Sequence, residues 1–259
     1  MTTAALETPL RRGTGYWWAS YVMMTRWVLT QQRVLFIGVV FGQIVMGIGA
    51  AFMYKFYLGS LDPISAMYLV TGIPALSLIP VGFVLVPILV VQEKTRGTYD
   101  FTWSLPVPRL APVAATFTVF TAIALPIAFA STILAAWQFD VTLIVSWTVI
   151  PFALLSSLMA TSVGYGMAMA IPEPRVTTLV TNVIIFVVLL FSPIVIPIER
   201  FPDWLATLQR VLPFYHMANL IRSGLSEDLT TDVGASLAIL LAWTVVGWSL
   251  VIRIVTRRG

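Results

Sequence analysis

Six long apolar runs set the strongest limit on how this chain can fold. Their bodies contain no Asp, Glu, Lys or Arg, and Arg253 lies at the very end of the sixth. Each is long enough to cross a bilayer, which takes about 20 apolar residues in a helix. With 59% hydrophobic and only 10% charged residues over 259 positions, the chain has too little polar surface for a soluble domain. The sequence therefore predicts an all-α integral membrane protein with six transmembrane helices. The predicted spans are Val34–Tyr54, Ile64–Val91, Leu110–Trp137, Leu143–Ile171, Val176–Ile198 and Gly234–Val255.

The basic residues predict the orientation of these spans. With both termini on one side, that side holds eleven Lys and Arg residues and the other side only four, Lys55, Arg200, Arg210 and Arg222. Short loops rich in Lys and Arg stay in the cytoplasm. We therefore expect both termini in the cytoplasm of a multi-pass plasma-membrane protein. The excess of Arg over Lys, with abundant Ala, Val and Trp, favours a bacterial source.

The segment before the first span has the pattern of an amphipathic helix. Apolar side chains recur at helical spacing, and polar ones share another face. The apolar set is Trp17, Tyr21, Met24, Val28 and Leu35, and the polar set is Arg26, Thr30 and Arg33. Such a helix is typical of the membrane surface. We predict a cytoplasmic interfacial helix here; the alternative is that this segment extends the first span.

Small residues and prolines mark special places within the spans. Small residues at intervals of four let helices approach closely, either within one subunit or at a dimer seam. They are Gly38 and Gly42 in the first span, and Ser156, Ala160, Gly164 and Ala168 in the fourth. The second span contains Pro74, Pro80 and Pro87, so we expect it to be kinked and to protrude into the cytoplasm.

The polar stretch Gln92–Arg109 separates the second and third spans. Gly97 can end one helix, Thr98 can cap the next, and Asp100 suits its first turn. The sequence Leu-Pro-Val-Pro that follows must be extended, because a residue before proline disfavours helix. We predict a stiff cytoplasmic knob whose aromatic side chains contact another protein; the alternative is an ordinary loop. The three aromatics are Tyr99, Phe101 and Trp103.

Two short amphipathic helices are predicted on the outer side, between the fifth and sixth spans. Pro202 starts the first, and its apolar stripe is Trp204, Leu205, Leu208 and Leu212. Pro213 starts the second, which closes near Gly224 and has Phe214, Met217, Ile221 and Leu225 on one face. Both are too short to cross a membrane. We expect a hairpin that dips into the outer leaflet or caps the protein, because such backbone survives in the membrane only when protein covers it.

Several classes of protein are excluded by what the sequence lacks. There is no cysteine and one histidine, His216, which excludes a metal centre built on thiolates or histidines and favours a packing role for that residue. Ionisable residues that would bind or relay an ion are absent from the spans. Neither Lys55 nor Lys94 lies in a GxxxxGK[ST] motif, so the chain cannot hydrolyse ATP by a P-loop. If the protein pumps, its energy comes from another polypeptide.

Two motifs resemble type-2 ATP-binding-cassette (ABC) exporter permeases. The first is the loop between spans two and three, through Glu93, Arg96, Gly97, Thr98, Leu105, Pro106 and Arg109. Tyr99 and Phe101 depart from it, because aliphatic residues are commoner there. The second motif follows the fifth span and comprises Ser192, Pro193, Pro197–Glu199, Pro202–Leu205, Leu212–Phe214, Ala218, Ile221 and Arg222. With six spans and an amphipathic N-terminus, the resemblance covers nearly the whole chain.

The resemblance implies one type-2 ABC transmembrane domain over residues 1–259. Its parts would be a cytoplasmic tail and interfacial helix in 1–33, a six-span bundle in 34–255, and a cytoplasmic tail in 256–259. Two permease subunits, identical or paralogous, would pair within the membrane lipids, and two ATPase subunits would bind ATP and Mg. The chain itself would bind no cofactor, metal or nucleic acid and would have no catalytic residue. The implied ATPase-coupling residues are Glu93, Arg96, Gly97, Thr98, Tyr99, Asp100, Phe101 and Trp103.

The resemblance also implies an extracellular gate and a substrate path. The outer helices around Glu199, Trp204 and Phe214 would form the gate, although Glu199 also suits a merely solvated acid. Uncharged candidates for the path favour an amphiphilic drug or a lipid as substrate, with a polysaccharide or lipid-linked glycan as the second choice. For each aromatic the alternative is packing or lipid contact. An ATP-independent channel or carrier is a further alternative. The path candidates are Phe36, Phe41, Gln43, Asn182, Phe186 and Phe191.

Overall fold

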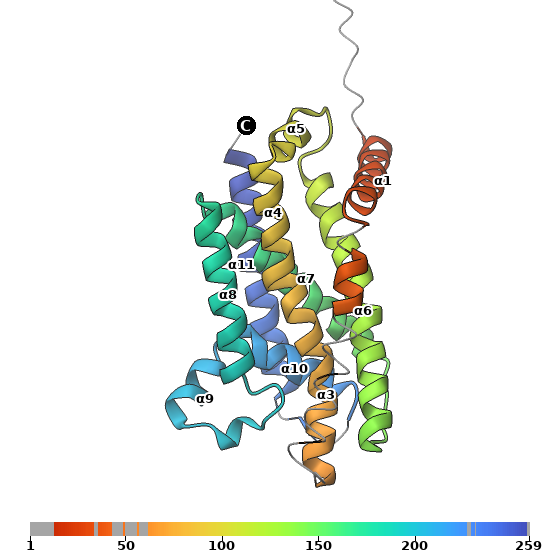
Figure 1. Ribbon diagram of the computed structural model, residues 1–259, viewed down its shortest axis with the longest axis vertical. Helices are drawn as coiled ribbons and strands as arrows, with labels where there is room; N and C mark the ends of the chain where they lie inside the picture. The colour runs from red at the N-terminus through yellow and green to blue at the C-terminus, as the bar shows by residue number, and fades with distance from the viewer. Residues whose placement is uncertain are drawn as a thin grey trace, which may run out of the picture.

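The computed structural model describes residues 13–33, 36–42, 49, 56, 62–226, 229–230 and 232–257. Within these ranges all regular structure is helical, and the long helices run along the long axis of the molecule (Figure 1). Five segments are long and apolar enough to cross a membrane. They are the continuous series α3 (Pro63–Pro80), η1 (Val81–Leu85) and α4 (Val86–Thr95), then α6 (Leu110–Phe139), α7 (Val149–Ala170), α8 (Pro174–Phe191) and α11 (Val233–Arg257).

The predicted first span, Val34–Tyr54, lies largely outside the described residues. Its residues 36–42 are helical, and the ring of Phe36 packs edge-on against Phe120 of α6, with centroids 5.4 Å apart. The predicted total of six spans therefore stays a prediction, while the other five are present as helices.

Two predicted span boundaries were wrong, and backbone geometry explains both. α8 ends at Phe191 rather than Ile198, because Pro193 forces Ser192 into an extended conformation. α7 begins at Val149 rather than Leu143. Ahead of it, the amides of Ile144 and Ser146 donate to the carbonyls of Leu225 and Gly224 at 3.1 and 2.8 Å. Residues 143–146 belong to the apolar run, but they are not helical and lie against the end of α10 (Pro213–Ser223).

The second predicted span contains a π-helical turn, and its predicted kink stays a prediction. α3 runs into η1 and then α4 without a break, and the Val86 amide bonds to the Val81 carbonyl, five residues back. The turn lies between Pro80 and Pro87, which both lack a backbone donor and so loosen the α-helical ladder around it. Pro63–Thr95 is therefore a single rod of 33 residues along the molecule.

This rod crosses α7 where both helices carry small residues. A Cβ built on Gly82 would overlap Ala160, and one built on Gly164 would overlap the Gly82 carbonyl oxygen. Ser156 and Ala168 are also buried inside the chain. Of the two roles open to this stripe, packing within one subunit is the one observed. By contrast, Gly38 has no neighbour within 4 Å of an added Cβ.

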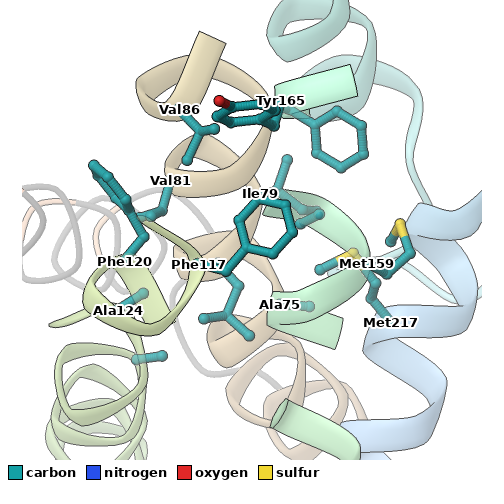
Figure 2. Packing of buried hydrophobic residues seen from close by; sticks show 14 of the residues in the cluster. Ala75, Ile79, Val81, Val86, Phe117, Phe120, Ala124, Met159, Tyr165 and Met217 are labelled. Atoms are coloured by element: carbon teal, nitrogen blue, oxygen red, sulfur yellow. The ribbon is translucent and has the colours of Figure 1, made fainter. Parts of the chain in front are cut away.

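Around the crossing, large side chains fill the core (Figure 2). Phe117 of α6 meets the rings of Tyr165 and Trp248 edge-on at 5.7 and 4.9 Å. Ile79 of α3 and Met159 of α7 are fully buried beside it. The bundle is thus packed through by aromatic and aliphatic side chains from α3, α6, α7 and α11.

The segment between α8 and α11, predicted to lie on the outer side, contains two α-helices in different environments. α9 (Asp203–Gln209) lies at one end of the bundle, whereas α10 is inserted among α3, α7 and α11 (Figure 1). α10 buries its predicted apolar face, with Phe214, Met217 and Ile221, but also its polar residues. Gln209 fastens α9 to the bundle, since its Nε2 donates to the Phe191 carbonyl at 2.9 Å.

Helix α1 (Thr14–Gln31) packs on α6 through the face predicted to be apolar. Met24 and Val28 are buried there, and the Tyr21 hydroxyl donates to Thr118 Oγ1 at 2.8 Å. Arg26, Thr30 and Arg33 are exposed, as their shared face predicts. Trp18, outside the predicted apolar face, is also exposed. Where α1 lies relative to a bilayer stays a prediction.

Candidate functional site

Helix α4 gives way to a second, short helix at Gly97. α4 ends at Thr95, Gly97 has a φ of 73°, and α5 spans Thr98–Ser104. Only glycine adopts this left-handed conformation without strain, so residue 97 sets the angle at which α5 leaves the rod. The prediction that Thr98 caps α5 was wrong: Gly97 is the N-cap residue, and no side chain caps the helix. Asp100 lies in the first turn, as predicted.

Helix α5 has an inner and an outer face, because residues four apart lie on the same side of a helix. Tyr99 is buried in the core, and its ring lies 5.5 Å from that of Trp103. Asp100 and Phe101 point the other way and are exposed. The predicted three-aromatic knob is therefore divided: two aromatics anchor α5, and one is free.

Lys94 ties the end of the rod to the end of α7. Its Nζ donates to the carbonyls of Ala168 and Ile171 at 2.6 and 3.4 Å. These carbonyls belong to the last turn of α7, where a cation also meets the negative end of the helix dipole. Glu93, one position earlier, is half-buried. No local pattern in the sequence predicts this contact of Lys94, because its partners lie 74 and 77 residues further along the chain.

We expect Lys94→Met to lower the free energy of unfolding by about 1.5–3 kcal/mol, because it removes a charged hydrogen bond from a buried helix end. The measurement is the thermal unfolding of the purified protein in detergent. Arg96→Met is the matched control, because Arg96 is exposed two positions later. Equal effects of the two substitutions would show that the contact with α7 contributes nothing.

The outer face of α5 continues onto α1. The rings of Phe101 and Trp27 lie 6.5 Å apart, and α1, α5 and the end of α11 share one end of the molecule (Figure 1). Arg96, Asp100 and Phe101, with Trp27 of α1, are all exposed there. We call these four residues the α5 surface. It offers two aromatic rings beside one cation and one carboxylate, which is the composition of a protein contact.

The predicted path residues do not form one lining within the chain. Phe36 is buried, and Gln43 lies outside the described residues. Phe41 is 69% exposed and Phe186 is 64% exposed. Asn182 and Phe186 lie one turn apart on the open face of α8, with Phe191 exposed at its end. Only this α8 pair is brought together.

The predicted gate residues are also dispersed. Trp204 of α9 is 68% exposed, and Glu199 is exposed in the 3-10 turn Ile198–Arg200 (η2). Phe214 instead lies inside the bundle, where its ring is 5.1 Å from that of Phe83. Phe214 is therefore placed to hold α10 against the rod rather than to close an opening.

The most buried charge described by the structure was missed by the sequence analysis. Arg222 of α10, counted among the basic residues of an outer loop, has 0% exposure. Its Nε donates to Thr71 Oγ1 at 3.1 Å, and its Nη2 donates to the carbonyls of Ile194 and Tyr68 at 2.7 and 3.3 Å. Its guanidinium carbon also lies 3.5 Å from the centroid of the Tyr68 ring. The available signal was its position next to Ile221 and four after Ala218, at the edge of the apolar stripe.

His216 forms a polar contact between α10 and α11. Its Nε2 donates to the Arg210 carbonyl at 2.8 Å, and its Nδ1 lies 3.0 Å from Ser236 Oγ, which also accepts from Asn219 at 2.9 Å. Burial lowers the pKa of His216. A neutral, hydrogen-bonded histidine agrees with the predicted packing role.

A family model for the ABC-2 type transporter matches residues 10–226, which include α1, the α5 surface and Arg222. The chain belongs to the ABC-2 type transporter family. Comparison with curated proteins gave no significant match. Membrane domains of the ABC-2 family are permease subunits that generally work with ABC ATPase subunits, which identifies this chain as a multi-pass membrane permease.

Proposed function

We propose that this ABC-2 permease is the transmembrane subunit of an exporter driven by a separate ATPase. The observation that carries the proposal is the α5 surface, an exposed contact face at the end of a rod that runs the length of the bundle. Rigid elements transmit a displacement that a flexible loop would absorb. ATP and Mg would be bound by the ATPase, and this chain would supply α5 as the coupling helix. The excess of basic residues favours a cytoplasmic location for this end.

A second permease subunit would complete the path. The open face of α8 carries Asn182. Lipid tails offer its side-chain amide no hydrogen bond, so the amide is stabilised where protein covers it or where it lines a path. Beside it lie Phe186 and Phe191, and no charged residue follows Arg175 in this helix. An uncharged, aromatic face of this kind suits an amphiphilic drug or a lipid. We propose that two such faces, from identical or paralogous chains, meet across the path.

The decisive experiment co-expresses the tagged chain with a candidate ABC ATPase that carries a P-loop motif, and then purifies the tagged chain. We expect the ATPase to co-purify, and inside-out vesicles to take up a fluorescent phospholipid or a rhodamine-type cation only with ATP. A lipid-linked oligosaccharide is the third probe, and exclusive uptake of it would favour the glycan alternative. Uptake by liposomes that contain the chain alone would overturn the proposal in favour of a channel or carrier.

A further inference from the structure

We propose that Arg222 is the positioning residue that joins the outer end of the rod to the outer helices, so that displacement of α5 is transmitted to the opposite side of the membrane. This inference rests on the proposed function and adds a residue that transmits the movement. Three segments far apart in the sequence meet at its guanidinium: α3 through Tyr68 and Thr71, the turn after α8 through Ile194, and α10 itself.

The joint formed by Arg222 and its three partners lies near the beginning of the rod, at the end away from α5. Tyr68 and Thr71 lie in the second and third turns of α3, near the beginning of the rod, whereas Lys94 and Gly97 lie at its other end. In Figure 1, the beginning of α3 and α9 share one end of the molecule, opposite α5. The guanidinium therefore lies at the contact through which a movement of the rod would be transmitted to α9 and α10.

Around Arg222, the turn after α8 and α3 are in close contact. The Tyr68 hydroxyl donates to the Pro193 carbonyl at 3.2 Å, next to the Ile194 carbonyl that accepts from Arg222. A Cβ built on Gly72 would overlap the Ile194 carbonyl oxygen, so glycine lets the turn after α8 lie directly on α3. The turn is thus held to α3 by backbone contact as well as by the arginine.

The chemistry of the arginine side chain suits it to hold these segments together. Arg222 is fully buried, and the acceptors that the structure gives it among the described residues are neutral oxygens in three directions. A planar guanidinium suits this arrangement, since it donates in fixed directions and stacks on the Tyr68 ring. If α3, α10 and the turn after α8 separated, the buried guanidinium would lose its hydrogen-bond acceptors. Leaving a buried charge without hydrogen bonds is costly in free energy. The elements around Arg222 therefore move together, as one rigid body.

The test uses the complete complex with its ATPase and single cysteines, which the cysteine-free sequence allows. One cysteine replaces Thr95 at the α5 end and another replaces Thr207 on α9; both positions are exposed. The rate of modification by a hydrophilic maleimide is measured at each site in detergent, without nucleotide and after trapping with ATP and vanadate. In the otherwise unaltered complex we expect both rates to change by about fivefold or more, the lower end of typical coupling between distant sites.

In Arg222→Gln, the ATP-dependent change at Thr207→Cys should fall below about twofold, while the change at Thr95→Cys persists. Arg210→Gln is the matched control: it also removes a positive charge from the outer segment, but its side chain is exposed, and both changes should persist. Thr71→Val, which removes a single acceptor at constant shape, should give an intermediate loss at Thr207→Cys. If Arg222→Gln does not fold, Thr71→Val is the variant that tests the role of the Arg222 contact.

A full ATP-dependent change at Thr207→Cys in folded Arg222→Gln or Thr71→Val would overturn the inference. Loss of the change at both sites would also overturn it, because a merely destabilising substitution acts on both ends. No response at Thr95→Cys in the unaltered complex would instead overturn the proposed function, on which the inference rests. The two failures are therefore distinguishable.

Discussion

Gly164→Leu is expected to lower the free energy of unfolding by about 3 kcal/mol or more, the upper end of the cost of overpacking a core. The Cβ added at residue 164 already overlaps the carbonyl oxygen of Gly82. It also lies 3.0 Å from the carbonyl carbon of Gly82 and 3.3 Å from Pro87 Cδ. Backbone atoms cannot move aside as a flexible side chain can. The rod and α7 must separate, which opens the core around Met159. A membrane domain with a total stability of about 5–15 kcal/mol would then be marginal.

The matched control is Gly38→Leu, which also replaces a helical glycine, but an exposed one with no atom within 4 Å of its added Cβ. It should be neutral or stabilising by about 0.8 kcal/mol, the gain in helix propensity over glycine. The measurement is the midpoint of thermal unfolding in detergent, followed by size-exclusion fluorescence. Equal midpoints for the two variants would contradict the close crossing of the rod and α7.

The sequence predicts the long helices well because hydropathy reports burial or lipid contact, which both spans and cores satisfy. It fails where an apolar segment takes its hydrogen bonds from elsewhere. Ile144 and Ser146 belong to an apolar run, but their amides bond to the end of α10. Periodicity and hydropathy carry no information on such distant partners, so the start of α7 was set six residues too early.

Arg222 shows the same limit for charge. Counting basic residues assigns a side of the membrane to each of them, which assumes that all lie in solvated loops. The partners that bury Arg222 are 28 to 154 residues away in the sequence, and two of them are backbone carbonyls, which every residue possesses. No local pattern encodes that combination. Only the placement beside an apolar stripe hinted at burial.

The candidate site was predicted in outline and corrected in detail. The prolines and Gly97 indicated a stiff element after the second span, but Tyr99, Phe101 and Trp103 were treated as one contact surface. Helical spacing places residues 99 and 103 together and residue 101 opposite. Binding of an ATPase to this surface stays a prediction. The two faces of α5 lead to different expectations, one for ATPase binding and one for stability.

Replacing the outer face of α5 should uncouple the complex without unfolding the permease. In the double variant Asp100→Ala, Phe101→Ala, we expect ATPase binding to weaken by about 2 kcal/mol or more, roughly 30-fold, because exposed aromatics beside charges are typical of interface hot spots. Substrate-stimulated ATPase activity should fall accordingly. Phe101 is 53% exposed, so the stability of the isolated permease should change by only about 0.5 kcal/mol beyond the loss of its contact with Trp27.

Tyr99→Ala is the contrasting variant on the inner face. Tyr99 is buried against Trp103, so its truncation should cost about 3 kcal/mol of stability, the usual effect of removing a large buried ring. ATPase affinity, unfolding midpoint and stimulated activity are measured for both variants. If the outer-face variant binds the ATPase with full affinity, α5 is not the contact. If Tyr99→Ala leaves the midpoint unchanged, the ring does not anchor α5, and the helix cannot act as the rigid end of the rod. If α5 is anchored to the bundle by one face and bound by the ATPase through the other, the outer-face variant should change binding. Tyr99→Ala should then change stability.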